Sequence, residues 1–208
     1  MSMDNTIQYY NQNAELYAAD TVDVDFSEVQ DRFITFLQEN SVDHNQASET
    51  IHILDFGCGS GRDTAYFLSK GFKVDAIDGS EELCKIAEKN TGVSVKCMLF
   101  SDLDETDKYD GIWACSSILH LPKDVLRDVL RKMITALKAN GIIYTSFKYS
   151  EFEGFRNGRY FTDFTSESFH EFIKEFEDIK VAEEWLSGDV RPGRGDERWL
   201  NLILQKLH

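Results

Sequence analysis

Residues 53–63 read ILDFGCGSGRD, and this stretch decides how the rest of the chain is interpreted. An apolar run over 53–56 stops at three glycines in alternate positions, Gly57, Gly59 and Gly61. A glycine-rich turn after a buried strand lets the backbone approach a ligand closely, and a following helix presents its N-terminal N–H groups there. The stretch therefore predicts a strand, a ligand-binding turn and a helix.

The spacing of these glycines excludes two phosphate-binding motifs. A dinucleotide fingerprint needs glycine at its sixth position, where this chain has Arg62, and a P-loop needs Gly-Lys-Ser/Thr, where it has Gly-Arg-Asp. Asp55 lies just before the turn, where its carboxylate would repel a pyrophosphate and attract an ammonium or sulfonium group. Asp78 ends the next apolar run and can accept hydrogen bonds from both ribose hydroxyls. The charges favour a cationic ligand that contains a nucleoside.

Apolar runs alternate with amphipathic segments from residue 51 onward. We expect strands at 51–56, 72–77, 93–98, 110–115 and 141–147, and helices at 60–70, 80–90 and 122–138. Such alternation is typical of right-handed crossovers and a parallel sheet. A polar, aromatic segment (149–164) then leads to a helix that begins near Thr165 or Ser166. The last two apolar runs, 178–187 and 198–206, are joined by a glycine-rich loop and should pair antiparallel.

Three motifs in order resemble those of class I S-adenosylmethionine-dependent methyltransferases: ILDFGCGSGRD, VDAIDGS (74–80) and YDGIWACSSILHLP (109–122). The likeness runs from about Tyr9 to the C-terminus and is strongest to small bacterial members described as general or tellurite-resistance-type methyltransferases. It implies an α/β fold with a Rossmann-like, doubly wound, seven-stranded sheet, mostly parallel, that ends in an antiparallel hairpin. It also implies S-adenosylmethionine as the cofactor.

The resemblance implies a role in cofactor binding for each of its motifs. The glycine turn would pass the methionine part, Asp78 would hold the ribose, and Cys115 with Ser116 would present backbone to the methionine ammonium. A helix over 6–18 carries two tyrosines on one face, which suits a lid over the cofactor, with a packing stripe as the alternative. The expected cofactor-binding residues are Tyr10, Tyr17, Asp55, Gly57, Cys58, Gly59, Gly61, Asp78, Gly79, Ser80, Phe100, Asp102, Leu103, Cys115 and Ser116.

His120 is the candidate catalytic residue because it follows the fourth expected strand, beside the position of the methyl group. A histidine there suits a general base, and the alternative is a helix-start residue that shapes the pocket. In-line transfer from a sulfonium also proceeds by proximity and alignment without a base.

Five of the nine arginines lie in the last third of the chain. Arginine forks match carboxylate and phosphate groups, so we expect an anionic group on the substrate. The alternative is a solvated loop in which neighbouring acids neutralise the arginines. The candidate substrate residues are Arg156, Arg159, Trp185, Arg191 and Arg194.

The composition excludes several other classes of protein and partner. A net charge of −15 without a basic stripe disfavours a nucleic-acid partner. The four cysteines show no metal-ligand spacing, so we expect no metal site and reduced thiols. No signal peptide or membrane span is expected, which favours a cytoplasmic location. The oligomeric state is not predicted.

We therefore expect a methyltransferase that acts on a small molecule by in-line transfer. Residues 1–50 should form an N-terminal helical lid and a linker over 40–49. Residues 51–208 should form the cofactor-binding methyltransferase domain, within a single structural domain overall. The alternatives are a non-catalytic regulator that binds S-adenosylmethionine or S-adenosylhomocysteine, and a nucleotide-linked dehydrogenase, against which the position of Arg62 argues.

Overall fold

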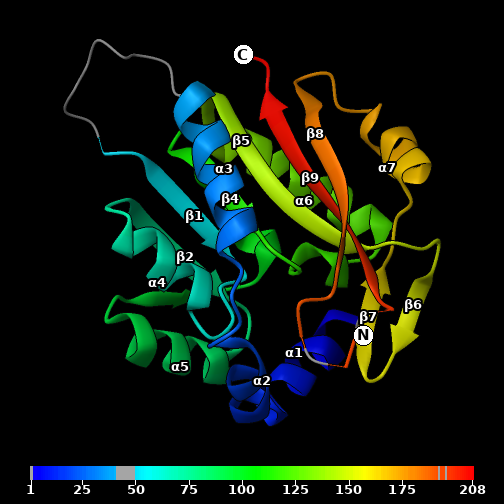
Figure 1. The fold of residues 1–208 in the computed structure, drawn as a ribbon. Helices are drawn as coiled ribbons and strands as arrows, with labels where there is room; N and C mark the ends of the chain where they lie inside the picture. Colours follow the sequence, from blue (N-terminus) through cyan, green and yellow to red (C-terminus); the bar gives the residue numbers. More distant parts are fainter. Residues whose placement is uncertain (1, 41–49, 192, 195) are drawn as a thin grey trace.

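A seven-stranded sheet forms the centre of the molecule in the computed structural model, which describes residues 2–40, 50–191, 193–194 and 196–208 (Figure 1). The strand order is β3-β2-β1-β4-β5-β9-β8. The first five strands are parallel, and β9 is antiparallel to both of its neighbours, β5 and β8. These strands are β1 (His52–Phe56), β2 (Lys73–Asp78), β3 (Val95–Cys97), β4 (Tyr109–Ala114), β5 (Leu137–Lys148), β8 (Ile179–Gly188) and β9 (Arg198–Lys206). The predicted parallel sheet and C-terminal hairpin are confirmed.

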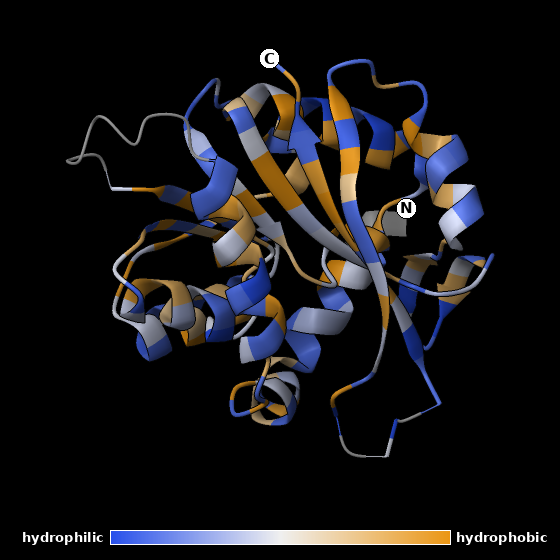
Figure 2. Cartoon of the chain, turned by 45° about the horizontal axis from the view of Figure 1, so that its top comes forward, coloured by the Kyte–Doolittle hydropathy of each residue, from blue (hydrophilic) through white to orange (hydrophobic). Residues whose placement is uncertain are grey.

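Helices cover both faces of the sheet, as expected for a doubly wound fold (Figure 1). One face carries α3 (Ser27–Asn40), α4 (Arg62–Ser69) and α5 (Glu81–Thr91), and the other carries α6 (Lys123–Ala136) and α7 (Ser166–Ile173). Hydrophobic residues are concentrated along the strands of the sheet, while hydrophilic residues are frequent on the helices (Figure 2). The predicted start of α7 is confirmed, because Thr165 and Ser168 form a capping box there.

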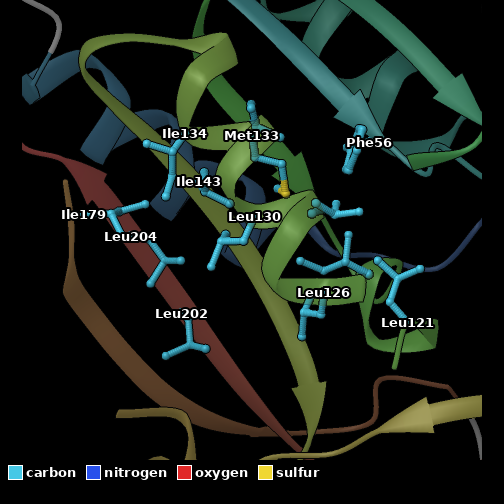
Figure 3. Packing of buried hydrophobic residues seen from close by; sticks show 14 of the residues in the cluster. Phe56, Leu121, Leu126, Leu130, Met133, Ile134, Ile143, Ile179, Leu202 and Leu204 are labelled. Atoms are coloured by element: carbon cyan, nitrogen blue, oxygen red, sulfur yellow. The ribbon is translucent and has the colours of Figure 1, made fainter. Parts of the chain in front are cut away.

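The larger core lies between α6 and the sheet. Figure 3 shows Leu126, Leu130 and Met133 of α6 turned toward Ile143 and Leu204 of the neighbouring strands. Their helical spacing gives α6 one continuous apolar face. This core fixes the position of the loop between β4 and α6, which carries part of the site described below.

The opposite core is built around α3. Phe33 and Leu37 are buried against Gly111, where an added Cβ would come within 2.8 Å of the Phe33 ring. The Trp113 ring beneath them stacks on Tyr144 at 4.1 Å between ring centroids. Residues 27–40 therefore pack against the sheet as part of the hydrophobic core. The lid expected over 1–50 does not include them. The expected linker, apart from Asn40 at the end of α3, lies outside the described residues.

The remaining elements lie beyond the carboxyl ends of the parallel strands (Figure 1). They are the helices α1 (Ser2–Gln12) and α2 (Ala14–Thr21) and a two-stranded hairpin of β6 (Glu153–Arg156) and β7 (Arg159–Thr162). Asn157 and Gly158 join β6 to β7 with φ values of 52° and 79°, as a two-residue type I′ turn requires. The hairpin corrects our description of 149–164, which foresaw no secondary structure.

Two details of the N-terminal helices also differ from our expectations. The single helix expected over 6–18 is two helices that meet at Asn13. At the start of α3, Ser27 and Gln30 fit the sequence pattern of a capping box, but their side chains make other contacts. The Asp25 carboxylate accepts hydrogen bonds from the backbone N–H and the hydroxyl of Ser27, at 3.0 and 2.6 Å. The buried Gln30 side chain donates to Asp63 at 2.6 Å, an interaction between elements that a local pattern does not reveal.

Candidate functional site

The glycine turn that follows β1 is held close to its neighbours. All three glycines have positive φ, between 57° and 93°. An added Cβ on Gly57 would lie 2.4 Å from Cβ of Ser117, and one on Gly59 would lie 3.2 Å from the Tyr17 ring. Gly61 instead faces α5, where a Cβ would come within 2.8 Å of Thr91. The first two glycines therefore shape the site, and the third allows α4 and α5 to pack closely.

Two adjoining cavities open beside this turn. The small cavity, of about 90 Å³, lies against the end of β2 and contains Asp78, Gly79, Leu99 and Phe100 in its wall. The large cavity, of about 410 Å³, lies between the N-terminal helices, the β6–β7 hairpin and the loop between β8 and β9. We call the residues that line both cavities the junction: Tyr10, Tyr17, Gly57, Cys115, Ser116 and His120.

Asp78 provides the polar end of the small cavity. Its carboxylate accepts hydrogen bonds from the backbone N–H groups of Gly59 and Ser80, at 2.9 and 2.8 Å. Burial raises the pKa of Asp78, and these backbone donors counter that shift. Ile7 and Phe100 add apolar surface to the same wall. One fixed carboxylate beside apolar walls suits a ribose with an attached base.

Four of the expected cofactor-binding residues line neither cavity. The buried Asp55 accepts a hydrogen bond from the Thr64 hydroxyl at 2.5 Å and thereby ties β1 to the first turn of α4. Burial, together with the nearby Asp63 carboxylate, raises the pKa of Asp55 to about 8. Asp102 is exposed and Leu103 is packed in the core, while Gly61 faces α5. The other eleven residues line at least one cavity.

A hydrogen-bonded chain crosses the junction from the N-terminal helix to the hairpin. The Tyr10 hydroxyl lies 2.8 Å from Nε2 of His120, and Nδ1 of His120 lies 2.6 Å from the Tyr160 carbonyl oxygen. Because a carbonyl only accepts, Nδ1 carries the proton and Nε2 accepts from Tyr10. Burial lowers the pKa of His120 to about 4, so the ring is neutral at pH 7. Both ring nitrogens are occupied, which favours a positioning role for His120 over that of a free base.

The backbone after β4 is strained where it meets the junction. Ser116 has a φ of 51°, which is uncommon for a residue other than glycine, asparagine or aspartate. Its N–H donates to the Ser146 hydroxyl at 2.9 Å, which links the loop to the end of β5. Burial raises the pKa of the neighbouring Cys115 thiol to about 12, so this thiol is protonated at pH 7. Outliers of this kind cluster at binding sites, where the surrounding structure holds them in place.

Most charged side chains in the wall of the large cavity are paired. Arg156 donates to the buried Asp163 at 2.8 Å, and Arg191 forms two hydrogen bonds with Asp189, at 2.9 and 2.5 Å. Lys148 forms ion pairs with both Asp189 and Glu197. The expected substrate residues Arg156, Arg159, Arg191 and Arg194 all line this cavity.

The structure places Trp185 away from both cavities. Its ring faces Tyr144, with 6.1 Å between centroids, and the Arg32 guanidinium lies 4.0 Å above it. Strand β8 alternates its side chains between two faces, and this position points toward α3 instead of the loop. Trp185 is therefore a packing residue of the α3 face, and we remove it from the candidate substrate residues.

The structure also reveals site residues that the sequence analysis did not assign. Arg62 and Asp63 pair at 2.8 Å in the cavity wall, where Asp63 also accepts from Trp113 at 2.9 Å. Ser146 and Lys148 lie at the carboxyl end of β5, where ligands bind in open α/β sheets. This rule could have identified the residues at the end of β5 as candidates from the sequence. The link from Asp63 to Trp113 joins residues fifty positions apart, and nothing local indicated it.

The described residues contain neither a membrane-spanning helix nor a cluster of metal ligands. No helix in the described part of the chain has the length and apolar character needed to cross a bilayer. Within the described ranges, no group of three or more histidine, cysteine, aspartate or glutamate side chains is arranged to hold a metal ion.

Comparisons with known proteins connect this geometry to a family. Residues 53–141 match the family model described as a methyltransferase domain. A putative methyltransferase of Bacillus subtilis, YqeM, is 31% identical over 110 residues, which cover 48% of this chain and 44% of that protein. The chain thus matches less than half the length of that relative. An uncharacterized methyltransferase of Staphylococcus carnosus is 25% identical over 169 residues, covering 77% of this chain and 80% of that one.

Among solved structures, the Burkholderia thailandensis 1,6-didemethyltoxoflavin-N1-methyltransferase has a TM-score of 0.69 at 21% identity. The alignment covers 99% of this chain and 89% of that enzyme, whose structure contains 1,6-didemethyltoxoflavin and S-adenosylhomocysteine. This likeness establishes the shared fold. None of these three proteins is described as a tellurite-resistance protein, so that part of the resemblance stays a prediction.

Proposed function

Because the chain carries the domain and the fold of the class I S-adenosylmethionine-dependent methyltransferases, we propose that it transfers a methyl group from S-adenosylmethionine to a small anionic molecule. The observation that carries this proposal is the pair of adjoining cavities, which meet at an uncharged junction. One ends at the fixed carboxylate of Asp78 between apolar walls, and the other is lined with cations. The sulfonium of the cofactor would supply the methyl group there.

The residues of the small cavity fit such a cofactor. Asp78 would accept hydrogen bonds from the ribose hydroxyls, and the walls at Gly79, Ser80 and Phe100 would enclose the adenine. The bare backbone at Gly57 leaves no side chain between the turn and the junction, where the methionine part would lie. Asp55 does not reach the ligand and would act only by holding the start of α4.

Methyl transfer in this site would depend on alignment. In-line displacement needs the acceptor held opposite the leaving sulfur at close range, and effective concentration alone supplies much of the rate. Tyr10 and Tyr17 would fix the cofactor from above, and the hydrogen bond from Tyr10 to His120 holds that tyrosine over the junction. We propose that His120 positions Tyr10 and does not remove a proton from the substrate.

The charge of the large cavity supports an anionic substrate. Seven arginine and lysine side chains line it against five aspartate and glutamate side chains, although the whole chain carries a net charge of −15. The volume of about 410 Å³ suits a small molecule. The Burkholderia enzyme of the same fold also binds a small molecule, which supports this substrate class.

Titration calorimetry tests the cofactor assignment. We expect binding of S-adenosylmethionine and S-adenosylhomocysteine, and no binding of NAD or ATP. NAD binding would favour the dehydrogenase alternative. Turnover is then followed by mass spectrometry of small-molecule extracts incubated with S-adenosylmethionine. Binding without any gain of methyl groups would favour a non-catalytic regulator.

A further inference from the structure

We propose that the methyl acceptor is a carboxylate oxygen, that Arg159 binds this carboxylate beside the junction, and that the product is a methyl ester. This inference rests on the proposed methyltransferase function and specifies its substrate class. It depends on two observations: an arginine without an acidic partner in the cavity wall, and the absence of an available base among the junction residues.

Arg159 differs from the other arginines in the wall of the large cavity, of which Arg194 and Arg198 are exposed and the remaining three are paired. Arg62, Arg156 and Arg191 each pair with an aspartate, whereas no ion pair of Arg159 occurs in the described part of the chain. One guanidinium nitrogen, Nη1, donates to the Tyr10 hydroxyl at 3.3 Å. Its Nε is buried and has no hydrogen-bond partner among the described residues. A buried donor without a partner is costly, and an arriving carboxylate would satisfy it.

The geometry of the hairpin explains why Arg159 lacks an acidic partner. Arg156 and Arg159 are directly opposite each other across the Asn157–Gly158 turn, and both guanidinium groups lie over the Phe161 ring, at 4.3 and 5.2 Å. Two like charges opposite each other destabilise a hairpin unless anions compensate them. Asp163 compensates Arg156 alone. The second positive charge therefore faces the cavity, ready for an anion from outside the chain.

Arg159 lies at the end of the large cavity that is next to the junction. Its side chain is hydrogen-bonded to Tyr10, a junction residue, and Tyr10 is in turn hydrogen-bonded to His120. Arg194, the other loop arginine, is exposed and lines only the large cavity. A carboxylate that occupies the free Nε of Arg159 would lie beside Tyr10, next to the methyl position and not in the outer part of the cavity.

The junction contains no group able to take a proton from a neutral acceptor at pH 7. Because burial lowers the pKa of His120 to about 4, its ring is neutral at pH 7. Its Nε2 lone pair is not available to a substrate proton, however, because it already accepts a hydrogen bond from Tyr10. Burial raises the pKa values of Tyr10, Tyr17 and Cys115, so all three remain protonated. Of the five carboxylates in the large cavity, four are paired with cations, and Asp196 lies in the exposed loop. An acceptor that arrives already ionised needs no base.

The step balances without a proton or a further reactant. A lone pair of the carboxylate oxygen forms the new C–O bond to the methyl carbon, while the C–S bond of the sulfonium breaks and its electron pair stays on sulfur. The negative charge of the carboxylate and the positive charge of the sulfonium disappear together. The products are a neutral methyl ester and S-adenosylhomocysteine. Loss of both charges also favours release of the ester from the cationic wall.

The binding test uses aromatic monocarboxylates, such as benzoate and indole-3-acetate, each beside its primary amide. They are titrated into the protein saturated with S-adenosylhomocysteine. We expect the carboxylates to bind about tenfold or more tightly than the amides, and Arg159→Gln to abolish that preference. Arg127→Gln is the control, because Arg127 likewise stacks on a phenylalanine but lies on α6 outside both cavities, where it pairs with Glu175. Arg159→Lys, which keeps the charge without the fork, should retain part of the preference.

The stability of the methylated product to alkali tests whether the acceptor atom is a carboxylate oxygen. The carboxylates that bind are incubated with S-adenosylmethionine labelled in its methyl group, and the products are treated with mild alkali. Methyl esters release volatile labelled methanol, whereas methyl groups on nitrogen, sulfur or an ether oxygen do not. Label released as methanol supports the proposal.

Several outcomes separate this inference from the proposed function. Base-stable methylated products would overturn the carboxylate acceptor and leave the methyltransferase intact. Equal binding of carboxylates and amides, or an unchanged preference in Arg159→Gln with unchanged affinity for S-adenosylhomocysteine, would overturn the anion site. If the protein bound neither form of the cofactor, the proposed function would fail and this inference with it.

Discussion

Asp78 is the single side chain on which cofactor affinity should depend most. It is fixed by two backbone donors and forms the polar end of the small cavity. Removing its carboxylate in Asp78→Ala should weaken binding of S-adenosylhomocysteine by about 1–3 kcal/mol, as expected for lost charge-assisted hydrogen bonds. Calorimetric titration measures the change, with the exposed Asp128→Ala on α6 as control. Equal affinity in both variants would show that the ribose binds elsewhere.

His120 should make the stability of the protein depend on pH. Its pKa is lowered from the usual 6.5 to about 4, so between these values the unfolded chain binds a proton that the folded chain does not. The free energy of unfolding therefore contains a contribution that is complete above pH 6.5 and falls by about 3 kcal/mol as the pH drops to 4.

The variant His120→Gln lacks this contribution, because glutamine does not titrate. Urea unfolding of both proteins at several pH values should show their difference in unfolding free energy shrinking as the pH falls from 6.5 to 4. Parallel stability curves across that window would mean that His120 is protonated as readily in the folded protein as in water.

For individual residues, the sequence predicted a place in the site correctly where the neighbouring residues are close along the chain. Gly57, Gly59 and Asp78 are defined by spacing along one strand–turn–helix–strand unit, so their places in the wall of the small cavity could be foreseen. Asp55 could not be placed correctly, because its partner Thr64 becomes apparent only when α4 folds back over β1. Arg156 differs from Arg159 because it pairs with Asp163. The number of charges in residues 149–164 does not reveal which of the two arginines this aspartate contacts.

Among the elements, α1 and α2 are the most dependent on other parts of the site. The Tyr160 N–H donates to the Thr6 hydroxyl at 3.0 Å, and the Ser80 hydroxyl donates to Asn11 at 2.7 Å. None of the described side chains of these two helices belongs to the two larger core clusters. Their local unfolding should therefore cost less free energy than global unfolding.

We accordingly expect amide hydrogen exchange in residues 6–18 to slow when S-adenosylhomocysteine binds beneath Tyr10 and Tyr17. Mass spectrometry after pepsin digestion resolves this segment, and α6 provides an internal reference whose exchange should not change. Full protection of 6–18 in the ligand-free protein would show that α1 and α2 form a fixed wall and not a lid.

The elements also show where pattern reasoning ends. The parallel strands and their helices follow from period and length, and the C-terminal hairpin from two apolar runs without a helix between them. The β6–β7 hairpin had its own signal, the Asn157–Gly158 pair, which is a strong predictor of a type I′ turn. The flanking residues are polar and aromatic and do not alternate as in an ordinary half-buried strand. The reason is that this hairpin packs against α1 and lines the large cavity, so it has no simple apolar face.

In the whole molecule, the site joins residues from both ends of the chain. Tyr10 and Asn201 line the same large cavity, which closes only because β9 inserts between β5 and β8. The strand direction was predictable: β8 runs parallel to β5, so the loop after β8 reaches the carboxyl ends where ligands bind. The pairing of Arg191 with Asp189 agrees with the alternative in which neighbouring acids neutralise the loop arginines. The ion pairs of Asp189 and Glu197 with Lys148 of β5 could not be foreseen from the loop alone.

The loop arginines should therefore assist capture of the substrate more than the transfer step. Arg191 is paired with Asp189 and Arg194 is exposed, and neither lines the small cavity or the junction. Replacing both by alanine changes the net charge from −15 to −17, which repels an anion further. We expect the affinity for S-adenosylhomocysteine to stay within about twofold, since the cofactor contacts remain.

Steady-state kinetics with a carboxylate substrate then distinguish the two roles. Loss of binding that is equal in the ground state and the transition state raises KM and leaves kcat unchanged, and we expect a KM increase of roughly tenfold. Arg159→Gln should differ, because a misplaced carboxylate also loses its alignment with the methyl group, so kcat falls as well. A lower kcat at constant KM in the double variant would instead place Arg191 and Arg194 against the reacting atoms, and the order of the arginines along the cavity would have to be reversed.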